Sequence, residues 1–254
     1  MAEFTRYVAM GDSFTEGVGD PDPQRPGGLR GWSDLVAEQL ASRTPEFRYA
    51  NLAIRGRLLD AIVDEQLGPA LDMAPDLVTI YAGGNDMMRP KFDVDRLVGR
   101  YDDAVAQLTA TGATVLVWTA YDAGWSPVFG KLRGRNAVYN ELVREVADRH
   151  GATLVDFWRF DEYDDHRMWD WDRLHMSSLG HRNMAARVLG VLGVEHALEP
   201  VSLGTLAPQP KSEARRENLV WAREFLLPWI SRRVRGTSSG DGVTAKRPVL
   251  APVG

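Results

Sequence analysis

The fold is indicated most clearly by the stretch Leu77-Val78-Thr79-Ile80-Tyr81-Ala82-Gly83-Gly84-Asn85-Asp86. Its first five residues are apolar, aromatic or β-branched without a break, which is typical of a strand buried on both faces of a sheet. The two glycines that follow predict a tight loop that ends the strand. A strand buried on both faces indicates a parallel sheet covered by helices on each side.

The chain around this strand alternates between β-rich runs and helical patterns up to about residue 192. In the predicted helices, apolar side chains recur every three or four residues, as at Val94, Leu97 and Tyr101. This alternation predicts an α/β protein with one parallel sheet of five strands. The other four strands are expected at about 7–10, 47–53, 114–118 and 153–156, and the helices at about 31–43, 58–63, 93–111, 138–146 and 179–192.

The composition excludes several classes of protein. Of the 254 residues, 44% are apolar, which is enough for one large domain. The absence of cysteine excludes disulfide-stapled and zinc-cysteine scaffolds. The net charge of −5 argues against a protein that coats nucleic acid non-specifically. No apolar run approaches the ~20 residues of a membrane span and no apolar leader follows Met1, so we predict a cytoplasmic location.

The C-terminal part of the chain differs in composition from the rest. Residues 197–211 are rich in proline and are predicted to form a linker. Residues 211–254 carry nine Lys and Arg against four Asp and Glu. We therefore predict an α/β domain at 1–196 and, at 197–254, a linker followed by a basic helical extension.

The extension contains one helical pattern, with apolar side chains at Leu219, Val220, Phe225 and Leu226. Basic residues beside an apolar face would allow this helix to lie on an anionic membrane. Acidic residues such as Glu224 interrupt the basic face, which favours packing on the α/β domain or on a second subunit. In the second case the extension would make the protein an oligomer.

Polar residues are predicted to gather at the carboxyl edge of the sheet, where open parallel sheets bind their ligands. The loop after the first strand contains Ser13, and Gly56 follows the second strand. Asn85 follows the third strand, and the loop after the fifth strand contains Asp172 and His175. Four loops that are distant in sequence are therefore expected to meet at one edge.

These residues are of the types that nucleophilic catalysis needs. The hydroxyl of Ser13 is a weak nucleophile that needs a neighbouring base, and the base needs a carboxylate to fix its tautomer. The spacing of three residues lets Asp172 reach Nδ1 of His175 while Nε2 faces Ser13. The amides of Ser13 and Gly56 and the side chain of Asn85 can supply the N–H donors of an oxyanion hole.

Four blocks of the sequence together resemble the SGNH or GDSL hydrolase family, and they occur in the order of that family. The blocks are Gly11-Asp12-Ser13-Phe14, residues 51–56, Gly83-Gly84-Asn85-Asp86 and Asp172-x-x-His175. The resemblance covers about residues 5–193, so residues 1–196 are expected to be an SGNH hydrolase domain. It implies the three-layer αβα, flavodoxin-like sandwich of that family, and esterase, lipase, thioesterase or carbohydrate-deacetylase activity without a cofactor.

The resemblance also implies a role for each residue of the expected site. Ser13 would be the nucleophile and His175 the base, with Asp172 orienting the imidazole as the third member of the triad. Gly56 and Asn85, together with the amide of Ser13, would bind the oxyanion.

Most of these residues also have an ordinary structural interpretation. Gly56 and Asn85 occur where turns are expected, and Asp12 is expected to organise its loop through hydrogen bonds to the backbone. The glycines around Ser13 could cradle a phosphate or a flavin, as in other proteins of flavodoxin-like topology. A non-catalytic binding domain is therefore the first alternative function.

The other histidines are expected to have no catalytic role. His150 lies at a helix end, where a positive charge is favourable, and His181 and His196 are expected at the surface. His166 lies in an acidic run that would suit a metal ion, and so a metal-dependent phosphoesterase is the second alternative. The run is long and mixed with aromatic residues, which is more typical of a solvated loop. We predict no metal and no other cofactor.

Aromatic residues are concentrated beyond the fourth and fifth strands. Trp125, Trp169 and Trp171 are candidates to line a pocket for an acyl group or a sugar. The predicted partner is a small-molecule ester rather than a nucleic acid. Lipid esters, acetylated sugars and thioesters are all compatible with the sequence.

Overall fold

The computed structural model describes residues 3–198, 203–205 and 210–253. Its centre is one six-stranded sheet with the strand order β5-β4-β3-β1-β2-β6. The five predicted strands are confirmed and run parallel to one another. They are β1 (Arg6–Gly11), β2 (Arg48–Asn51), β3 (Leu77–Tyr81), β4 (Thr114–Trp118) and β5 (Thr153–Val155).

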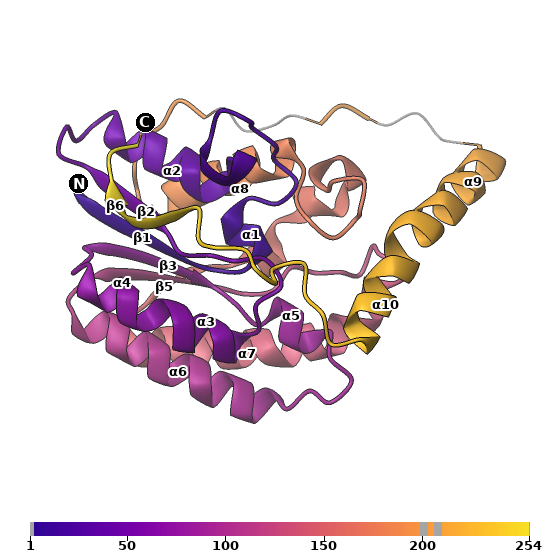
Figure 1. The fold of residues 1–254 in the computed structure, drawn as a ribbon, viewed down its shortest axis with the longest axis horizontal. Coiled ribbons are helices and arrows are strands. Elements are labelled where there is room, and N and C mark those ends of the chain that lie inside the picture. The colour runs from indigo at the N-terminus through magenta and orange to yellow at the C-terminus, as the bar shows by residue number, and fades with distance from the viewer. Residues whose placement is uncertain (1–2, 199–202, 206–209, 254) are drawn as a thin grey trace.

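Helices cover both faces of the sheet, which confirms the predicted three-layer α/β sandwich (Figure 1). One face is covered by α2 (Gly31–Ala41) and α8 (Ser178–Val191). The other face is covered by α3 (Leu59–Ile62), α4 (Gly68–Asp72), α6 (Val94–Ala110) and α7 (Arg133–His150). The π-helical η2 (Val63–Leu67) joins α3 to α4 without a break. Shorter helical turns lie in the loops: α1 (Ser13–Glu16), α5 (Gly84–Met87), η1 (Pro26–Gly28), η3 (Phe129–Leu132), η4 (Phe157–Arg159), η5 (Asp161–Asp164) and η6 (His166–Met168).

The core lies on both sides of the sheet because alternate side chains of a strand point to opposite faces. In β1, Tyr7 and Ala9 pack in the apolar cluster beneath α2 and α8. Val8 and Met10, one residue further along, pack in the cluster beneath α3, α6 and α7. Burial on both faces leaves the ends of the central strands as the places where a polar site can form.

The sheet has one strand more than the sequence predicted. Residues Arg247–Ala251 form β6, which runs antiparallel to β2 at the edge of the sheet. The prediction of a purely parallel, five-stranded sheet is therefore corrected to a mixed sheet of six strands. Pro248 is compatible with β6 because an edge strand does not need every backbone N–H for pairing.

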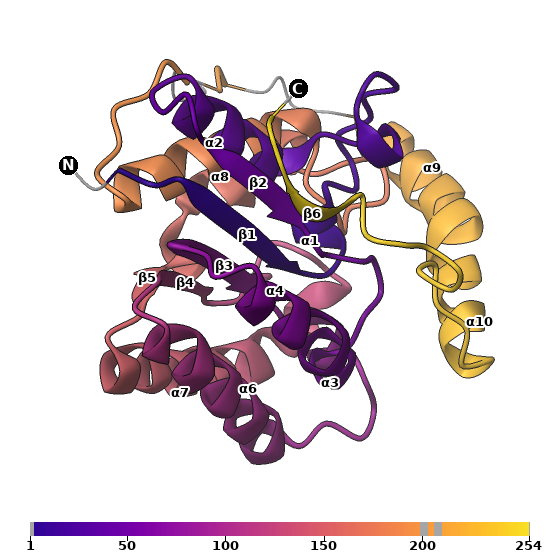
Figure 2. The same cartoon turned by 60° about the vertical axis from the view of Figure 1, so that its left-hand side comes forward.

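The C-terminal extension crosses the molecule before it reaches β6. Its helices are α9 (Lys211–Trp221), the π-helical η7 (Ala222–Leu226) and α10 (Leu227–Val234). Both views show them outside the three layers, at one end of the sheet (Figures 1 and 2). Parts of the predicted linker, at 199–202 and 206–209, lie outside the described residues, and the division of the chain at 196/197 stays a prediction.

A buried ion pair fastens the end of the extension to the α/β domain. Nζ of Lys246 lies 3.0 Å from Oδ2 of Asp34, and both side chains are only 2% exposed. The same ammonium group donates to the carbonyl oxygen of Arg30 at 2.6 Å. A buried charge must be paired or hydrogen-bonded to be stable, so these contacts hold the chain in place just before β6.

His181 is buried in α8, so the expectation that it lies at the surface is wrong. Its Nδ1 accepts a hydrogen bond from the backbone N–H of Trp32 at 3.1 Å, and its Nε2 lies 3.0 Å from the carbonyl oxygen of Val18. These two contacts require the neutral tautomer with a proton on Nε2. Because α8 packs against α2, position 181 faces the interior.

Acid should destabilise the protein through His181. Burial lowers the pKa of this histidine from 6.5 to about 4, so only the unfolded chain binds its proton between these values. Stability from this residue is therefore present above pH 6.5 and is lost as the pH falls towards 4. We expect it to contribute about 2 kcal/mol to the loss of unfolding free energy between about pH 7.5 and about pH 5, measured by urea unfolding.

The variant His181→Gln separates this contribution from that of other titrating groups. Its amide can still donate to Val18, but it does not titrate. We expect a lower stability at neutral pH and a smaller loss on acidification than in the wild type. His196→Gln is the control, since His196 is partly exposed and should keep the wild-type pH dependence. An unchanged pH dependence in His181→Gln would contradict the prediction.

Candidate active site

Ser13 begins α1 directly after β1, in a turn that permits no side chain at Gly11. A Cβ on Gly11 would lie 2.6 Å from the carbonyl oxygen of Tyr81, and φ there is +150°. The side-chain amide of Gln66 bonds both the N–H and the carbonyl of Gly11, at 2.8 and 2.9 Å. Asp12 caps the short helix by accepting from the N–H of Phe14 at 3.1 Å. These contacts fix the position of Ser13, which is 6% exposed.

Asp172 and His175 form a close pair within one turn. Oδ2 of Asp172 lies 2.5 Å from Nδ1 of His175, and Oδ1 accepts the backbone N–H groups of Leu174 and His175 at 2.9 Å each. Burial raises the pKa of Asp172, but the hydrogen bonds from His175 and Leu174 outweigh it and hold that pKa below its ordinary value. The carboxylate therefore stays charged beside the imidazole.

Five residues of the expected site line one cavity of about 300 Å³: Ser13, Gly56, Asn85, Asp172 and His175. Within the described ranges, no hydrogen bond joins Oγ of Ser13 to Nε2 of His175. Catalytic hydrogen bonds in empty sites are often long and tighten only when substrate binds.

Asn85 is oriented by a carboxylate that the sequence did not assign to it. Nδ2 of Asn85 donates to Oδ2 of Asp12 at 3.0 Å and to the carbonyl oxygen of Arg57 at 3.2 Å. Asp12 is 2% exposed, and burial raises its pKa to about 7. Asp12 thus organises its loop, as expected, and also holds the amide of Asn85.

The segment that carries Gly56 is held against α1 by an ion pair. The carboxylate of Glu16, which is 4% exposed, accepts from the backbone N–H of Arg55 at 2.6 Å and from its guanidinium. Gly56 follows with φ at +75°, in the left-handed region that glycine adopts without strain. Sequence reasoning missed Glu16, although its position one turn after Ser13 was a usable signal.

A model of the GDSL-like lipase/acylhydrolase family matches residues 9–182, which include Ser13, Asn85 and His175. The chain belongs to this family. It is therefore a hydrolase that acts on ester bonds. Family membership favours this activity over the flavin-binding and metal-dependent alternatives.

Solved structures share the fold of this GDSL-like hydrolase. LAE5, an alpha/beta hydrolase from the metagenome of Lake Arreo, Spain, is 25% identical with a TM-score of 0.59, covering 76% of this chain and 97% of that one. TesA is 23% identical with a TM-score of 0.58, and the match covers 74% of this chain and 98% of TesA. A catalytic mutant of Axe2, an acetylxylan esterase from Geobacillus stearothermophilus, is 20% identical with a TM-score of 0.64. This match covers 77% of this chain and 97% of the Axe2 chain. No curated protein matches the chain by sequence.

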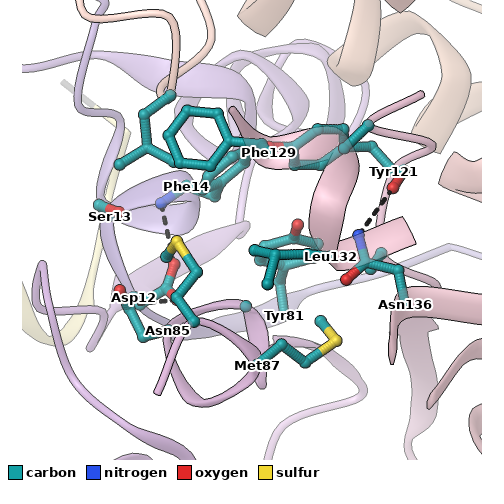
Figure 3. A pocket seen from close by; sticks show the side chains of 15 residues that line it. Asp12, Ser13, Phe14, Tyr81, Asn85, Met87, Tyr121, Phe129, Leu132 and Asn136 are labelled. Carbon is teal, nitrogen blue, oxygen red and sulfur yellow. Dashed lines mark hydrogen bonds between the residues drawn. The ribbon is translucent and has the colours of Figure 1, made fainter. Parts of the chain in front are cut away.

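A second, narrower cavity of the hydrolase opens beside Ser13 (Figure 3). Its volume is about 40 Å³, enough for about three or four heavy atoms if a water needs 10–15 Å³ on this scale. Apolar side chains form most of its wall, and Ser13, Asp12 and Asn85 lie at one end (Figure 3). The apolar wall includes Phe14, Tyr81, Met87, Tyr121, Phe129 and Leu132.

The three tryptophans expected to line a pocket occupy different environments. Trp169 is 4% exposed, and its ring centre lies 4.6 Å from that of Tyr121. Trp125 packs on Trp169 at 5.6 Å. Trp171 is 62% exposed and lines the larger cavity. Among the described residues, the larger cavity at Ser13 is lined by Trp171, and Trp125 and Trp169 line neither that cavity nor the narrower one.

Two carboxylates of the acidic run around His166 form ion pairs with arginines. Arg167 binds Asp165 at 2.6 Å, and Arg187 binds Glu162 at 2.7 Å. Among the residues that the structure describes, no three His, Cys, Asp or Glu side chains form a group that could hold a metal ion. Within the same ranges, every helix is too short or too polar to cross a bilayer.

Replacing Asp12 by asparagine should slow ester hydrolysis. In Asp12→Asn, the amide oxygen of the new side chain can still cap α1, but its NH₂ group would face the NH₂ group of Asn85. Two donors cannot bond to each other, so the side chain of Asn85 would turn away. We expect kcat/KM for p-nitrophenyl acetate to fall about 10- to 100-fold, less than the loss of about 10²- to 10³-fold that follows complete removal of one oxyanion donor. Asp76→Asn is the control, because Asp76 also accepts backbone N–H bonds, but from Thr5 and Arg6. Wild-type turnover by Asp12→Asn would show that Asp12 does not orient Asn85 for the reaction.

Proposed function

We propose that the hydrolase cleaves carboxylic esters or thioesters with Ser13 as nucleophile, His175 as base and Asp172 as the residue that orients the base. The observation that carries this proposal is the 2.5 Å contact of Asp172 with Nδ1 of His175 in a cavity shared with Ser13. A proton held on Nδ1 by this contact leaves Nε2 free to accept one, which is what a general base requires.

The first half of the reaction forms an acyl-enzyme. Oγ of Ser13 attacks the carbonyl carbon while its proton passes to Nε2 of His175. The carbonyl oxygen becomes an oxyanion, which the amides of Ser13 and Gly56 and the side chain of Asn85 would bind. The tetrahedral intermediate then collapses, the bond to the leaving oxygen or sulfur breaks, and His175 returns the proton to the leaving group.

The second half releases the acid. A water molecule attacks the acyl carbon while His175 takes one of its protons. When the second intermediate collapses, the proton passes back to Oγ of Ser13, and the enzyme is regenerated. Asp172 stabilises the imidazolium in both halves without accepting the proton itself.

The narrow cavity beside Ser13 supports the assignment of the acyl side. It is apolar over most of its wall and adjoins both Ser13 and Asn85, as an acyl group bound at the oxyanion hole would require (Figure 3). Its volume of about 40 Å³ suits an acyl chain of a few carbon atoms. We therefore propose that short acyl groups are preferred.

Removing the nucleophile or one oxyanion donor should give effects of different size. We expect Ser13→Ala to lower kcat for p-nitrophenyl acetate by about 10⁴- to 10⁶-fold and to abolish labelling by a fluorophosphonate probe. Asn85→Ala should lose about 10²- to 10³-fold in kcat but keep the labelling site. Ser42→Ala, on the exposed end of α2, is the control and should keep full activity. Wild-type turnover in Ser13→Ala would overturn the mechanism.

The acyl assignment predicts a dependence on chain length. Across a series of p-nitrophenyl esters, kcat/KM should be higher for acetate and butyrate than for octanoate, because longer chains exceed the cavity. Leu132 lines the cavity and is only partly buried, so Leu132→Ala should enlarge it without unfolding the protein. We expect the ratio of octanoate to acetate activity to rise about threefold to tenfold, the effect of a few additional buried methylene contacts. An unchanged ratio would place the acyl chain elsewhere.

A further inference from the structure

The larger cavity at Ser13 is built only in part by the residues that match the family. The match ends at residue 182, but the cavity is also lined by residues of the C-terminal extension. The extension and the α/β domain therefore form one composite site. The residues from the extension are Glu224, Phe225, Trp229, Arg232, Thr237, Ser238 and Ser239.

The helical part of the extension docks on the turn that carries the proposed base. Nε1 of Trp221 donates to the carbonyl oxygen of Asp172 at 2.8 Å. The guanidinium of Arg173 lies 5.0 Å from the centre of the Trp221 ring, and its Nη1 donates to Oδ1 of Asn218 at 2.6 Å. Trp221 is 8% exposed, so this contact is buried. The extension is thus held directly against Asp172 and Arg173.

The loop after α10 closes the opposite side of the cavity. Gly240 packs on the backbone of Arg55, where a Cβ would lie 2.0 Å from the carbonyl oxygen. Oγ of Ser238 lies so close to Gly56 that a Cβ on this glycine would be 2.2 Å from it. Beyond this loop, Lys246 and β6 anchor the chain to the domain. The extension therefore runs along this end of the sheet between two fixed ends, the contact of Trp221 and strand β6 (Figure 2).

Two arginines line this cavity and form no salt bridge within the described part of the chain. Arg89, after α5, is partly buried, and its Nε has no hydrogen-bond partner among those residues. Arg232 lies on α10 and is exposed. Arg55, the third arginine at the cavity, is already neutralised by Glu16.

The acidic groups at or near this cavity form no salt bridge with either arginine among the described residues. Asp172 is paired with His175, and Glu224 is exposed to solvent. Asp86 attracts Arg89 through space, but its Oδ2 accepts from the N–H of Leu59. Cationic guanidinium groups beside three hydroxyls match the oxygens of a carboxylate, sulfonate or phosphate.

We propose that the extension completes the leaving-group side of the site and that Arg89 and Arg232 select esters whose alcohol or thiol carries a negative charge. The inference rests on the proposed function of Ser13, since it assumes that the acyl group occupies the narrow cavity. The negative group on the leaving side then lies in the larger cavity, between the α/β domain and the extension.

A pair of esters that differ only in charge tests the proposal. Meta-acetoxybenzoate and meta-acetoxybenzamide present the same acetyl group and the same position of substitution on the leaving phenol. We expect kcat/KM to be about tenfold higher for the anionic ester, the scale of a charge-assisted hydrogen bond. Raising the ionic strength from about 0.01 M to about 1 M, which shortens the Debye length from about 30 Å to about 3 Å, should reduce this preference.

Substitutions at the two arginines locate the source of the preference. Arg89→Gln and Arg232→Gln should each lower the ratio of the two kcat/KM values about threefold to tenfold, whereas Arg89→Lys and Arg232→Lys should preserve most of it. Arg223→Gln is the matched control, because Arg223 is exposed in the same helical run but does not line the cavity. A wild-type ratio near or below one, or a ratio that both glutamine variants leave unchanged, would overturn the proposal.

Equilibrium binding separates this proposal from the assignment of the nucleophile. The phenol products, meta-hydroxybenzoate and meta-hydroxybenzamide, can be titrated into Ser13→Ala by calorimetry. Charge selection is supported if Ser13→Ala binds the benzoate more tightly than the benzamide, and if adding Arg89→Gln or Arg232→Gln removes this difference. This result would hold even if Ser13 were not the nucleophile. Equal binding of both phenols by Ser13→Ala overturns charge selection, while loss of turnover in Ser13→Ala would still support the mechanism.

Discussion

Asp172 is held from two directions, and the geometry of the proposed site depends on this. Its carboxylate accepts from Nδ1 of His175 and from two backbone N–H groups of its own turn, while its carbonyl oxygen accepts from the indole of Trp221. A buried carboxylate without such donors would take up a proton and lose its hold on the imidazole. The donors therefore keep the carboxylate both charged and in one orientation. Because Trp221 belongs to the extension, the same turn joins the two parts of the cavity.

Similar buried polar pairs fix the other loops at this edge of the sheet. Asp12 holds Asn85, and Glu16 holds the segment before Gly56. Each pair joins segments that are far apart in the sequence. Removing one partner would leave a buried carboxylate without one of its hydrogen-bond donors, so these contacts resist rearrangement. A preorganised edge of this kind is what an oxyanion hole requires, since its donors must already point at the developing charge.

The sequence predicted the elements whose signal is local. The continuous apolar run at 77–81 identifies β3, and the apolar side chains that recur every three or four residues at 93–111 identify α6. Both patterns arise because burial determines which positions along an element must be apolar. The sequence also predicted that Ser13, Asn85 and His175 meet at one edge of the sheet, because parallel strands place their carboxyl ends together; the three residues line one cavity. The edge strand β6 shows no such pattern, and it contains Pro248, a residue type that is rare in strands away from a sheet edge.

The features that the sequence did not predict depend on contacts between distant segments. His181 has the same local pattern whether α8 is exposed or packed on α2, so only the tertiary structure shows that it is buried. The bond from Asn85 to Asp12 joins residues 73 positions apart. Trp169 and Trp171 are neighbours of the same type, but one is buried and the other exposed. Spacing and composition contain no information on any of these differences.

The composite cavity separates two requirements that a hydrolase must meet. Chemistry at the carbonyl needs donors and a base fixed to within a fraction of an ångström, and the proposed ones lie in the part of the chain that matches the family. Recognition of the leaving group tolerates more variation, and in the proposed arrangement much of its surface comes from residues 224–239. That surface is anchored by Trp221 on one side and by Lys246 with β6 on the other, outside the cavity itself. Substitutions between these anchors can therefore change the leaving group that is accepted without disturbing Ser13, Asn85 or His175.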